Sequence, residues 1–320
     1  MGLVIGTDEA GYGPNLGPLV ITATAWRVPE DPRAFDFWSA LEEAVINEAP
    51  RSSGRLHVAD SKQVYSPGKG LRELERSVLS LLSLRNDVPT RGVTGFRELF
   101  DLLVAADTGD ALDAEPWFHD SDLSLPVACE AADLPGLSAG LQSVCSDSGI
   151  ELVAAQSDVV LTERFNQLTT KYDSKGLALS RLTMQLIRSV WDPDSTEPIL
   201  IISDKHGGRN RYDDLIDEQL DGQMIFRVLE SRQKSSYRIG KTEMHFQQGA
   251  ERHFPAAVSS MICKYMRELS MELFNGFWQQ HLPELKPTKG YPTDAKRFRA
   301  EIAEKQRELG IADSTLWRAR

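Results

Sequence analysis

At 320 residues, the chain is long enough to bury a substantial core, as one large domain or two of ordinary size. Its hydrophobic content of 41% and charged content of 26% are typical of a globular protein. The longest apolar runs are strand-sized and much shorter than the ~20 residues that span a bilayer. The N-terminus has no signal-peptide pattern, and the cysteines Cys129, Cys145 and Cys263 are widely spaced, so we expect reduced thiols and a cytoplasmic protein.

Charge is distributed unevenly along the chain, whose net charge is −11. Residues 101–160 contain 12 acidic and no basic residues, whereas residues 227–299 contain 13 basic and 7 acidic ones. Nucleic-acid binding depends on local positive potential rather than on the total, so the acidic balance does not exclude such a ligand. Either stretch could equally be an ordinary solvated face, so charge alone decides nothing.

The first third of the chain predicts two strands followed by helices. Apolar runs at 3–7 and 19–26, separated by a glycine-rich turn, indicate a pair of strands. Helical spacing of apolar residues predicts helices at 35–49, 71–84 and 96–106.

The remainder continues the alternation after an acidic region, 85–149, that is punctuated by proline and glycine. Strands are predicted at 150–160, 198–202 and 224–229, and helices at 162–190, from 255 onward and at 293–309. The run 198–202 is apolar throughout, as in a strand buried on both faces, and leads to Asp204. Alternating strands and helices predict an α/β domain with helices packed on a central sheet.

Carboxylates stand at the ends of two predicted strands. Asp8 and Glu9 are adjacent and mutually repulsive, an arrangement that a divalent cation would make tolerable. The glycines that follow let the backbone come close to a ligand. Asp204 ends the buried strand, where open α/β sheets place ligands. If the two strands are neighbours, Asp8 and Asp204 could bridge one metal ion; alternatively, Asp204 caps a loop or helix.

Taken in order, five motifs resemble those of the ribonuclease HII family. Residues 8–14, Asp-Glu-Ala-Gly-Tyr-Gly-Pro, and then 17–20, Gly-Pro-Leu-Val, resemble the family's opening Asp-Glu-Ala-Gly-Arg-Gly-Pro and Gly-Pro-Val-Val. The later matches are Asp60-Ser61-Lys62, the strand 199–204, the Ala- and Ser-rich helix 255–264 with Arg267 and Glu268, and the Lys-Gly-Tyr-Pro-Thr of 289–293. The resemblance spans the chain except for the acidic region and some loops, as in a divergent member with an insertion.

The resemblance implies an α/β fold of the ribonuclease H-like type, a central mixed β-sheet flanked by helices, with a helical C-terminal part and an inserted acidic region. It implies a ribonuclease H-like domain formed by 1–84 and 150–270, interrupted by the acidic insertion 85–149 and followed by a C-terminal helical extension, 271–320. The insertion could be a lid, a flexible loop or, around 101–160, the surface for a partner.

The family also implies four carboxylates that hold two Mg²⁺ or Mn²⁺ ions. Asp8, Glu9 and Asp204 match three of them directly. Strict counting for the fourth lands on Ala250, whereas a one-residue gap selects Glu251, which we predict as the ligand. Asp8, Glu9, Asp204 and Glu251 are thus the predicted catalytic and metal-binding residues.

Substrate-binding roles follow from the same resemblance. The family reads the ribonucleotide 2′-hydroxyl through the backbone of a Gly-Arg-Gly loop, which here is Gly11-Tyr12-Gly13. Tyr12 removes any phosphate contact of the arginine, which leaves the preference for a ribose–deoxyribose junction open. Ser61 and Lys62 would contact phosphate, and Tyr291 would stack on the deoxyribose that follows the ribonucleotide.

Two further basic features are noted. A second Asp-Ser-Lys occurs at 173–175 and is interpreted as a coincidence. The segment 227–241, rich in Arg and Lys, could line a duplex groove or form an exposed hairpin.

The resemblance implies a monomeric, metal-dependent endonuclease for RNA–DNA hybrids or duplex DNA with embedded ribonucleotides. It would cut 5′ to a ribonucleotide and leave 3′-hydroxyl and 5′-phosphate ends. Two alternatives stay open: a non-catalytic relative that binds hybrids, and a nuclease of the same fold that acts on structured RNA or branched DNA.

Overall fold

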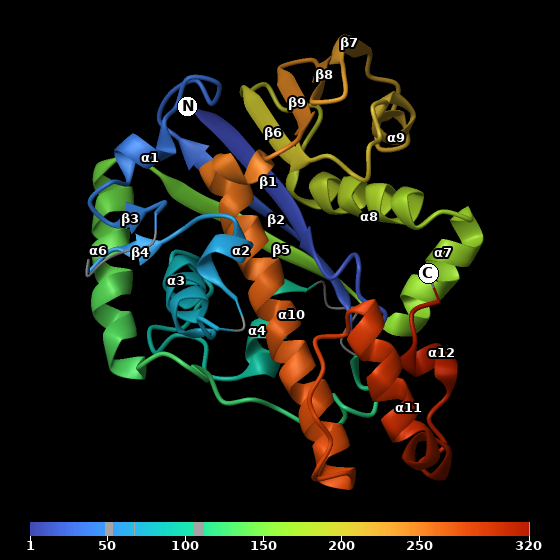
Figure 1. The fold of residues 1–320 in the computed structure, drawn as a ribbon. Coiled ribbons are helices and arrows are strands. Elements are labelled where there is room, and N and C mark those ends of the chain that lie inside the picture. The colour runs from blue at the N-terminus through green and yellow to red at the C-terminus, as the bar shows by residue number, and fades with distance from the viewer. Residues whose placement is uncertain (49–53, 67, 105–111, 320) are drawn as a thin grey trace.

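The computed structural model describes residues 1–48, 54–66, 68–104 and 112–319. Its centre is a seven-stranded sheet with the strand order β5-β2-β1-β6-β9-β8-β7 (Figure 1). These strands are β1 (Gly2–Ala10), β2 (Leu19–Val28), β5 (Glu151–Val160), β6 (Ile199–Asp204), β7 (Ile225–Glu230), β8 (Lys234–Ile239) and β9 (Thr242–Gln247). A separate two-stranded sheet joins β3 (Val45–Ile46) and β4 (Leu56–His57).

The sheet is mixed, with its parallel part at the centre. Strand β1 runs antiparallel to β2 and parallel to β6, and β6 runs parallel to β9. Strands β8 and β7 then add an antiparallel hairpin at one edge. The carboxyl ends of β1, β6 and β9 therefore meet at one end of the sheet, where ligands are usually bound.

Helices cover both faces of the sheet (Figure 1). The long helix α10 (Phe254–His281) lies across β1 and β2 on one face, together with α3 (Arg72–Leu82), and α8 (Lys175–Val190) covers the other face. Alternate residues of β1 divide between these layers: Val4 is buried with α10, and Ile5 with α8. The further helices are α1 (Phe37–Ala40), α2 (Ser61–Val64), α4 (Phe96–Leu103), α6 (Leu134–Asp147), α7 (Thr162–Tyr172), α9 (Asp213–Asp217), α11 (Pro292–Glu308) and α12 (Asp313–Leu316), with 3-10 turns η2 (Ala131–Asp133) and η3 (Ala250–Arg252).

The N-terminal end of α10 is fixed directly against the central strands. A β-carbon at Gly6 would lie 2.2 Å from the carbonyl carbon of Pro255, so only glycine allows this approach. The Ser259 hydroxyl donates to the Gly6 carbonyl (2.8 Å), and the Thr24 hydroxyl donates to the Pro255 carbonyl (2.9 Å). These contacts set which residues of α10 face the end of β1.

The predicted fold class is confirmed: a central mixed sheet flanked by helices, with a helical C-terminal part. The helices expected at 71–84, 96–106 and 293–309 occur as α3, α4 and α11, although residues 105 and 106 lie outside the described residues, and the strand at 198–202 occurs as β6. The segment 227–241 belongs to the β7–β8 hairpin, one of the two possibilities considered for it.

Two predicted helices were wrong in extent. The helix expected at 35–49 is a single turn, α1, after which the chain turns into the short strand β3. Phe37 packs against Trp26 of β2 and Phe254 at the start of α10. Residue 49 itself lies outside the described residues. The helix expected at 162–190 is broken at Asp173, whose φ is 46°, and Ser174 begins α8 by accepting from the Leu177 amide (3.2 Å).

Residues of the acidic region that the structure describes share a core with the rest of the molecule. Phe96, Phe100, Trp117 and Leu141 are buried in the same cluster as α3 and α10 residues. The proposed domain boundaries stay predictions. Among the described residues, no helix is both long and apolar enough to cross a membrane.

Candidate active site

The parallel register of β1 and β6 places Asp8 beside Asp204. The paired residues at the strand ends are Thr7 and Ser203, whose hydroxyls are hydrogen-bonded at 2.8 Å. Asp8 and Asp204 each come one residue later. Because side chains alternate along a strand and neighbouring strands lie ~4.8 Å apart, both carboxylates leave the sheet on the face opposite to those hydroxyls, toward α10. Both are partly exposed to solvent.

Glu251 reaches this strand end from the turn between β9 and α10. It lies in η3 and is partly buried. The Gly249 amide just before it donates to Asp204 Oδ1 at 3.1 Å, which ties the turn to β6. Glu251 also contributes to the negative potential at Asp8. The structure thus brings Glu251, rather than the side chain of Ala250, into the electrostatic field of the other acids.

The carboxylates at this strand end have raised pKa values. Burial raises the pKa of Asp8 to about 7, and the charges of Asp204 and Glu251 add to the shift, although a hydrogen bond from Ser260 opposes it. Burial, and then the charges of Asp8 and Asp204, raise the pKa of Glu9 to about 8. The pKa of Asp204 is also raised by burial. The site therefore favours protons or cations over a set of free carboxylates.

The Asp60-Ser61-Lys62 motif borders the same site. Asp60 caps the short helix α2 by accepting from the Lys62 amide at 3.0 Å. The Ser61 and Ser260 hydroxyls are hydrogen-bonded to each other at 3.1 Å, and Ser260 is also hydrogen-bonded to Asp8. Lys62 is exposed, and its pKa is raised by Asp60 and, to a lesser extent, by Asp8, Glu251 and Asp204. The sequence did not assign a role to Ser260, which links the motif to Asp8.

The chemistry of this donor set fits a hard divalent cation. Carboxylate oxygens are the ligands that Mg²⁺ and Mn²⁺ prefer, and a bound cation would offset the cost of burying these charges, which is the main cause of the raised carboxyl pKa values. In the described part of the chain, however, no three His, Cys, Asp or Glu side chains already converge as a finished metal site. Metal binding by Asp8, Glu9, Asp204 and Glu251 is therefore a proposal that rests on their shared field and strand positions.

The glycine-rich loop follows directly on β1. Gly11 has a φ of 89°, and a β-carbon there would lie 2.5 Å from the Pro18 carbonyl oxygen. Gly13 is exposed, with open space around its α-carbon. Tyr12 is partly exposed between them, and the Lys175 ammonium lies 4.4 Å from the centroid of its ring. The second Asp-Ser-Lys is thus not part of the carboxylate cluster, but its lysine contacts the loop.

Two buried arginines hold the inner side of this loop. Arg267 of α10 donates to the carbonyls of Leu16 (3.2 Å), Pro18 (2.5 Å) and Lys289 (3.1 Å). Burial lowers the pKa of this guanidinium to about 10. Because the carbonyl oxygens are engaged from within, the loop is held in one backbone conformation.

Arg318, close to the end of the chain, also holds the inner side of the loop, beneath Gly11 and Tyr12. Its side chain is fully buried and donates to the carbonyls of Gly11 (2.6 Å), Tyr12 (3.3 Å) and Gly17 (3.4 Å). The guanidinium carbon lies 3.9 Å from the centroid of the Phe165 ring in α7, next to which Figure 1 shows the C-terminus. Burial lowers the pKa of Arg318 to about 9. No local sequence pattern could have identified Arg318, because its partners are some 300 residues away in the chain.

Tyr291 lies beside the same loop. The Gly290 carbonyl accepts from the backbone amides of Asn15 (2.8 Å) and Leu16 (3.3 Å), which fixes this segment to the loop. Tyr291 precedes α11, and its side chain is 56% exposed, so the ring is available to a ligand. The neighbouring Lys289 ammonium is held by Glu268 at 2.6 Å. The structure therefore gathers every predicted substrate-binding residue around one end of the sheet.

Comparisons with known proteins find similarity to solved structures alone. No protein-family model and no curated protein matches the sequence significantly. Among solved structures, the chain is similar to the ribonuclease H2 of Pyrococcus horikoshii, with a TM-score of 0.48, 16% identity, and coverage of 98% of this chain and 92% of that chain. It is also similar to the ribonuclease HII of Archaeoglobus fulgidus, solved in complex with PCNA (TM-score 0.46, 13% identity, 99% and 94% covered).

A third similar structure is Bst-RNase HIII in complex with Mn²⁺, with a TM-score of 0.44, 16% identity, and coverage of 99% of this chain and 66% of that chain. These similarities extend over nearly the whole chain, but the superpositions are loose and the identities low. The residues at the strand ends, and not these overall similarities, carry the functional proposal.

Proposed function

We propose that the protein is a metal-dependent endonuclease that hydrolyses the RNA of RNA–DNA hybrids. It cuts 5′ to a ribonucleotide and leaves 3′-hydroxyl and 5′-phosphate ends. The single observation that supports this most strongly is the position of Asp8 and Asp204 at the adjacent ends of two parallel strands, with Glu9 and Glu251 in the same electrostatic field. The glycine-rich loop beside them supplies backbone that a nucleotide can approach.

Each part of the site has a distinct role in this proposal. Asp8, Glu9, Asp204 and Glu251 would hold two Mg²⁺ or Mn²⁺ ions, which activate the attacking water and stabilise the leaving 3′ oxygen. Asp8, Glu9 and Asp204 lie in the strands β1 and β6, which hold them in place and so reduce the reorganisation needed for catalysis.

Recognition of the substrate falls to the residues around the loop. Backbone amides of Gly11-Tyr12-Gly13 would contact the ribose 2′-hydroxyl, since Arg267 and Arg318 hold the carbonyls on the inner side. Lys62 and Ser61 would contact a phosphate, and the exposed ring of Tyr291 would stack on the following sugar.

The test is cleavage of labelled duplexes that differ only in their ribose content. With Mg²⁺ or Mn²⁺, we expect cutting of a DNA duplex that carries one embedded ribonucleotide, on the 5′ side of that nucleotide, and of a long RNA–DNA hybrid. An all-DNA duplex should stay intact, and chelation should stop the reaction. Binding of hybrids without cleavage at any metal concentration would instead establish a non-catalytic role. Cleavage that ignores the ribose would point to structured RNA or branched DNA as the substrate.

Substitution of Glu251 tests the fourth carboxylate. We expect Glu251→Gln to lower metal-dependent cleavage by roughly 100-fold, in the range of changes that perturb a metal's ligand environment, with little change in thermal stability. Glu272→Gln is the matched control, because Glu272 lies exposed on α10 away from the strand end. Full activity of the Glu251→Gln variant would remove Glu251 from the site.

A further inference from the structure

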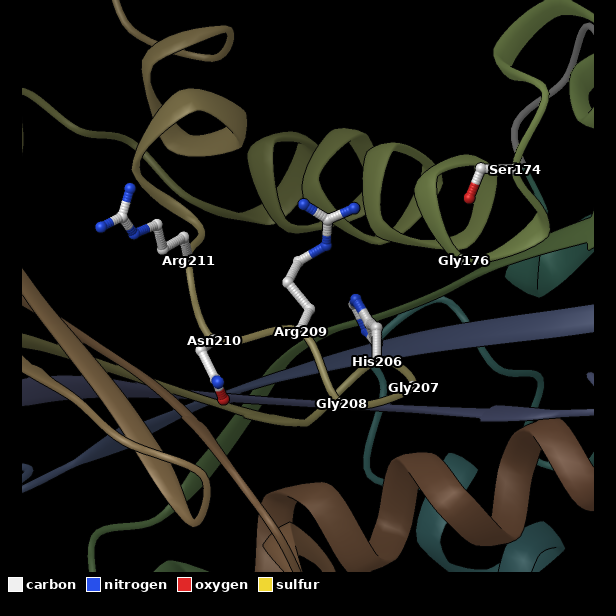
Figure 2. A pocket seen from close by; sticks show the side chains of 8 residues that line it. All are labelled: Ser174, Gly176, His206, Gly207, Gly208, Arg209, Asn210 and Arg211. Atoms are coloured by element: carbon white, nitrogen blue, oxygen red, sulfur yellow. The ribbon is translucent and has the colours of Figure 1, made fainter.

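A cavity beside the proposed active site is lined by arginines and backbone amides. It has a volume of about 610 Å³, is open to solvent, and is bordered by the start of α8 (Ser174 and Gly176) and by residues 206–211, the loop that follows Asp204 (Figure 2). Figure 2 shows the side chains of Arg209 and Arg211 rising from this loop on the side of α8. Neither these arginines nor the cavity has a role in the proposed cleavage site.

The loop 206–211 is held rigidly from beneath by the buried Lys205. Its ammonium donates to the carbonyls of Arg209 (3.1 Å) and Ser231 (2.6 Å), to Asn210 Oδ1 (3.0 Å) and to the Ser235 hydroxyl (3.1 Å). The basic side chain that comes directly after Asp204 thus shapes the loop instead of contacting a ligand.

Residues on either side of the glycines are equally fixed. The His206 amide donates to the Tyr212 hydroxyl (3.0 Å), and the ring of Tyr212 stacks on that of Phe246 with centroids 3.7 Å apart. His206 Nδ1 is hydrogen-bonded to Ser180 of α8 at 3.1 Å. A loop with so many internal contacts is preorganised, as binding sites require.

Arg209 is the charged group with no partner in this loop. Among the described residues, its guanidinium takes part in no hydrogen bond or ion pair, and its Nε is fully buried without an acceptor. Leaving a buried donor unsatisfied costs about 1–3 kcal/mol, and more for a charged group. Arg211, on the same rim, is 77% exposed and lies 3.7 Å from Glu230. An anion with several acceptor oxygens would satisfy Arg209 in the way that carboxylates satisfy other arginines.

The backbone around the cavity also favours an anion. Gly207 and Gly208 have φ values of 56° and 84°, and in the described structure their amides donate to no protein acceptor. Across the cavity, α8 begins with Ser174 as its cap, so the amides of Lys175 and Gly176 point outward at the positive end of a 16-residue helix. Two arginines and unpaired amides facing one cavity make a site for phosphate oxygens.

The position of the cavity indicates which kind of phosphate would bind there. One side begins two residues after Asp204, and the other reaches Gly176, where a β-carbon would lie 3.6 Å from the Tyr12 hydroxyl. The cavity therefore lies next to the end of β6 that carries Asp204 and beside Tyr12 of the glycine-rich loop, on the α8 side of the sheet. Because it is open rather than enclosed, a polymer can pass through it with one phosphate seated.

We propose that this cavity binds a backbone phosphate of the nucleic-acid substrate, with Arg209 as its principal ligand. The proposal rests on the proposed function only for the identity of the polymer, since the site would hold a phosphate whether or not the bond nearby is cut. Arg209 donates from its guanidinium fork, Arg211 adds charge at the rim, and the amides of Gly207 and Gly208 complete the contacts.

The test is duplex binding measured by fluorescence anisotropy in the presence of EDTA, so that cleavage plays no part. The probe is a labelled DNA duplex with one embedded ribonucleotide. We expect Arg209→Gln to weaken binding about 10-fold and to lower the slope of log Kd against log salt by about 1. Arg209→Lys should keep the salt dependence but bind less tightly than the native protein, since an ammonium lacks the fork. Arg27→Gln should bind normally, because Arg27 is a partly exposed arginine at the far end of the sheet, where β2 pairs with Leu3 of β1.

A series of duplexes, each with one phosphate replaced by a neutral methylphosphonate, locates the contact. The native protein should lose about 10-fold in affinity at one position, and Arg209→Gln should lose nothing more at that position. Unchanged binding by Arg209→Gln, or a loss spread equally over all positions, would overturn the proposal. Melting temperatures of the variants confirm that they fold. If Arg209→Gln binds the duplex weakly and the native protein never cleaves, the phosphate site is supported and the proposed nuclease activity is rejected. If the native protein cleaves and Arg209→Gln binds normally, the nuclease activity is supported and the phosphate site is rejected.

Discussion

Asp8→Asn is expected to abolish metal-dependent cleavage and, in EDTA, to make the protein more stable than the native chain above neutral pH. The carboxyl pKa of Asp8 is raised to about 7 in the folded protein, mainly by burial, from an ordinary value near 3.8. A raised carboxyl pKa means that the folded state binds the proton more tightly than the unfolded state does. The stabilising effect of that proton is complete below about pH 4 and is lost as the pH rises to about 7.

The size of the effect follows from the same shift. A shift of about three pKa units corresponds to about 4 kcal/mol, but the partial exposure of Asp8 screens its charge, so we expect about 1–2 kcal/mol. The neutral amide of asparagine avoids the cost of the buried charge at every pH. The difference in the free energy of unfolding between Asp8→Asn and the native protein should therefore be small at pH 4 and reach its maximum above pH 7.

Urea unfolding in EDTA at several pH values measures this difference. Asp87→Asn is a matched control, because hydrogen bonds from Arg85 lower the pKa of Asp87, so its substitution should reduce stability where Asp87 is charged. Addition of Mn²⁺ should stabilise the native protein and have much less effect on Asp8→Asn. A native protein that stays more stable than Asp8→Asn at pH 8 in EDTA would contradict the cost of burying the Asp8 charge on which this prediction depends.

Arg318→Met is expected to lower cleavage of a duplex with one ribonucleotide by about 100-fold while metal binding is kept. The substitution removes the donors that hold the carbonyls of Gly11, Tyr12 and Gly17, so the loop amides lose their fixed orientation. A small misplacement of positioning groups can cost this much in rate. Because Arg318 lies on the inner side of the loop, it acts as a positioning residue and not as a catalytic one.

Three measurements separate this role from a general loss of structure. The ratio of Kd for the ribonucleotide-containing duplex and the all-DNA duplex should approach 1 in Arg318→Met, and Mn²⁺ affinity should be unchanged. Arg307→Met is the control, since Arg307 is exposed and donates within α11, to the Ala303 carbonyl. If Arg318→Met kept full ribose discrimination, the loop would not depend on this arginine.

The carboxylate positions were predictable because strand ends leave a local signal. An apolar run that stops at Asp8 and another that stops at Asp204 indicate two buried strands with acids at their carboxyl ends, and the register of β1 and β6 agrees with this. The position of Glu251 relative to the other acids depends on how η3 turns between β9 and α10, which the sequence does not reveal, and its role as a ligand stays a prediction.

Features that depend on distant packing could not be predicted. Residues 35–49 have helical spacing, but only Phe37–Ala40 form a helix, and Phe37 packs against Trp26 and Phe254, which are distant in the sequence. Likewise, the buried positions of Arg318 beneath the loop and of Ser260 beside Asp8 bring together residues about 250 to 300 apart in the chain, which no spacing in the sequence reveals. Local sequence patterns therefore predict which residues end a strand, whereas tertiary packing decides which distant residues contact them.

Anomalous diffraction from crystals of the protein soaked in Mn²⁺ tests the proposed metal centre most directly. We expect two peaks about 3.5–4 Å apart at the end of β1 and β6, with carboxylate oxygens of Asp8 and Asp204 within ligand distance. Crystals of Asp8→Asn should lose at least one of them. A single peak elsewhere on the molecule, or full occupancy of both peaks in Asp8→Asn, would contradict the assignment of this strand end as a two-metal nuclease site.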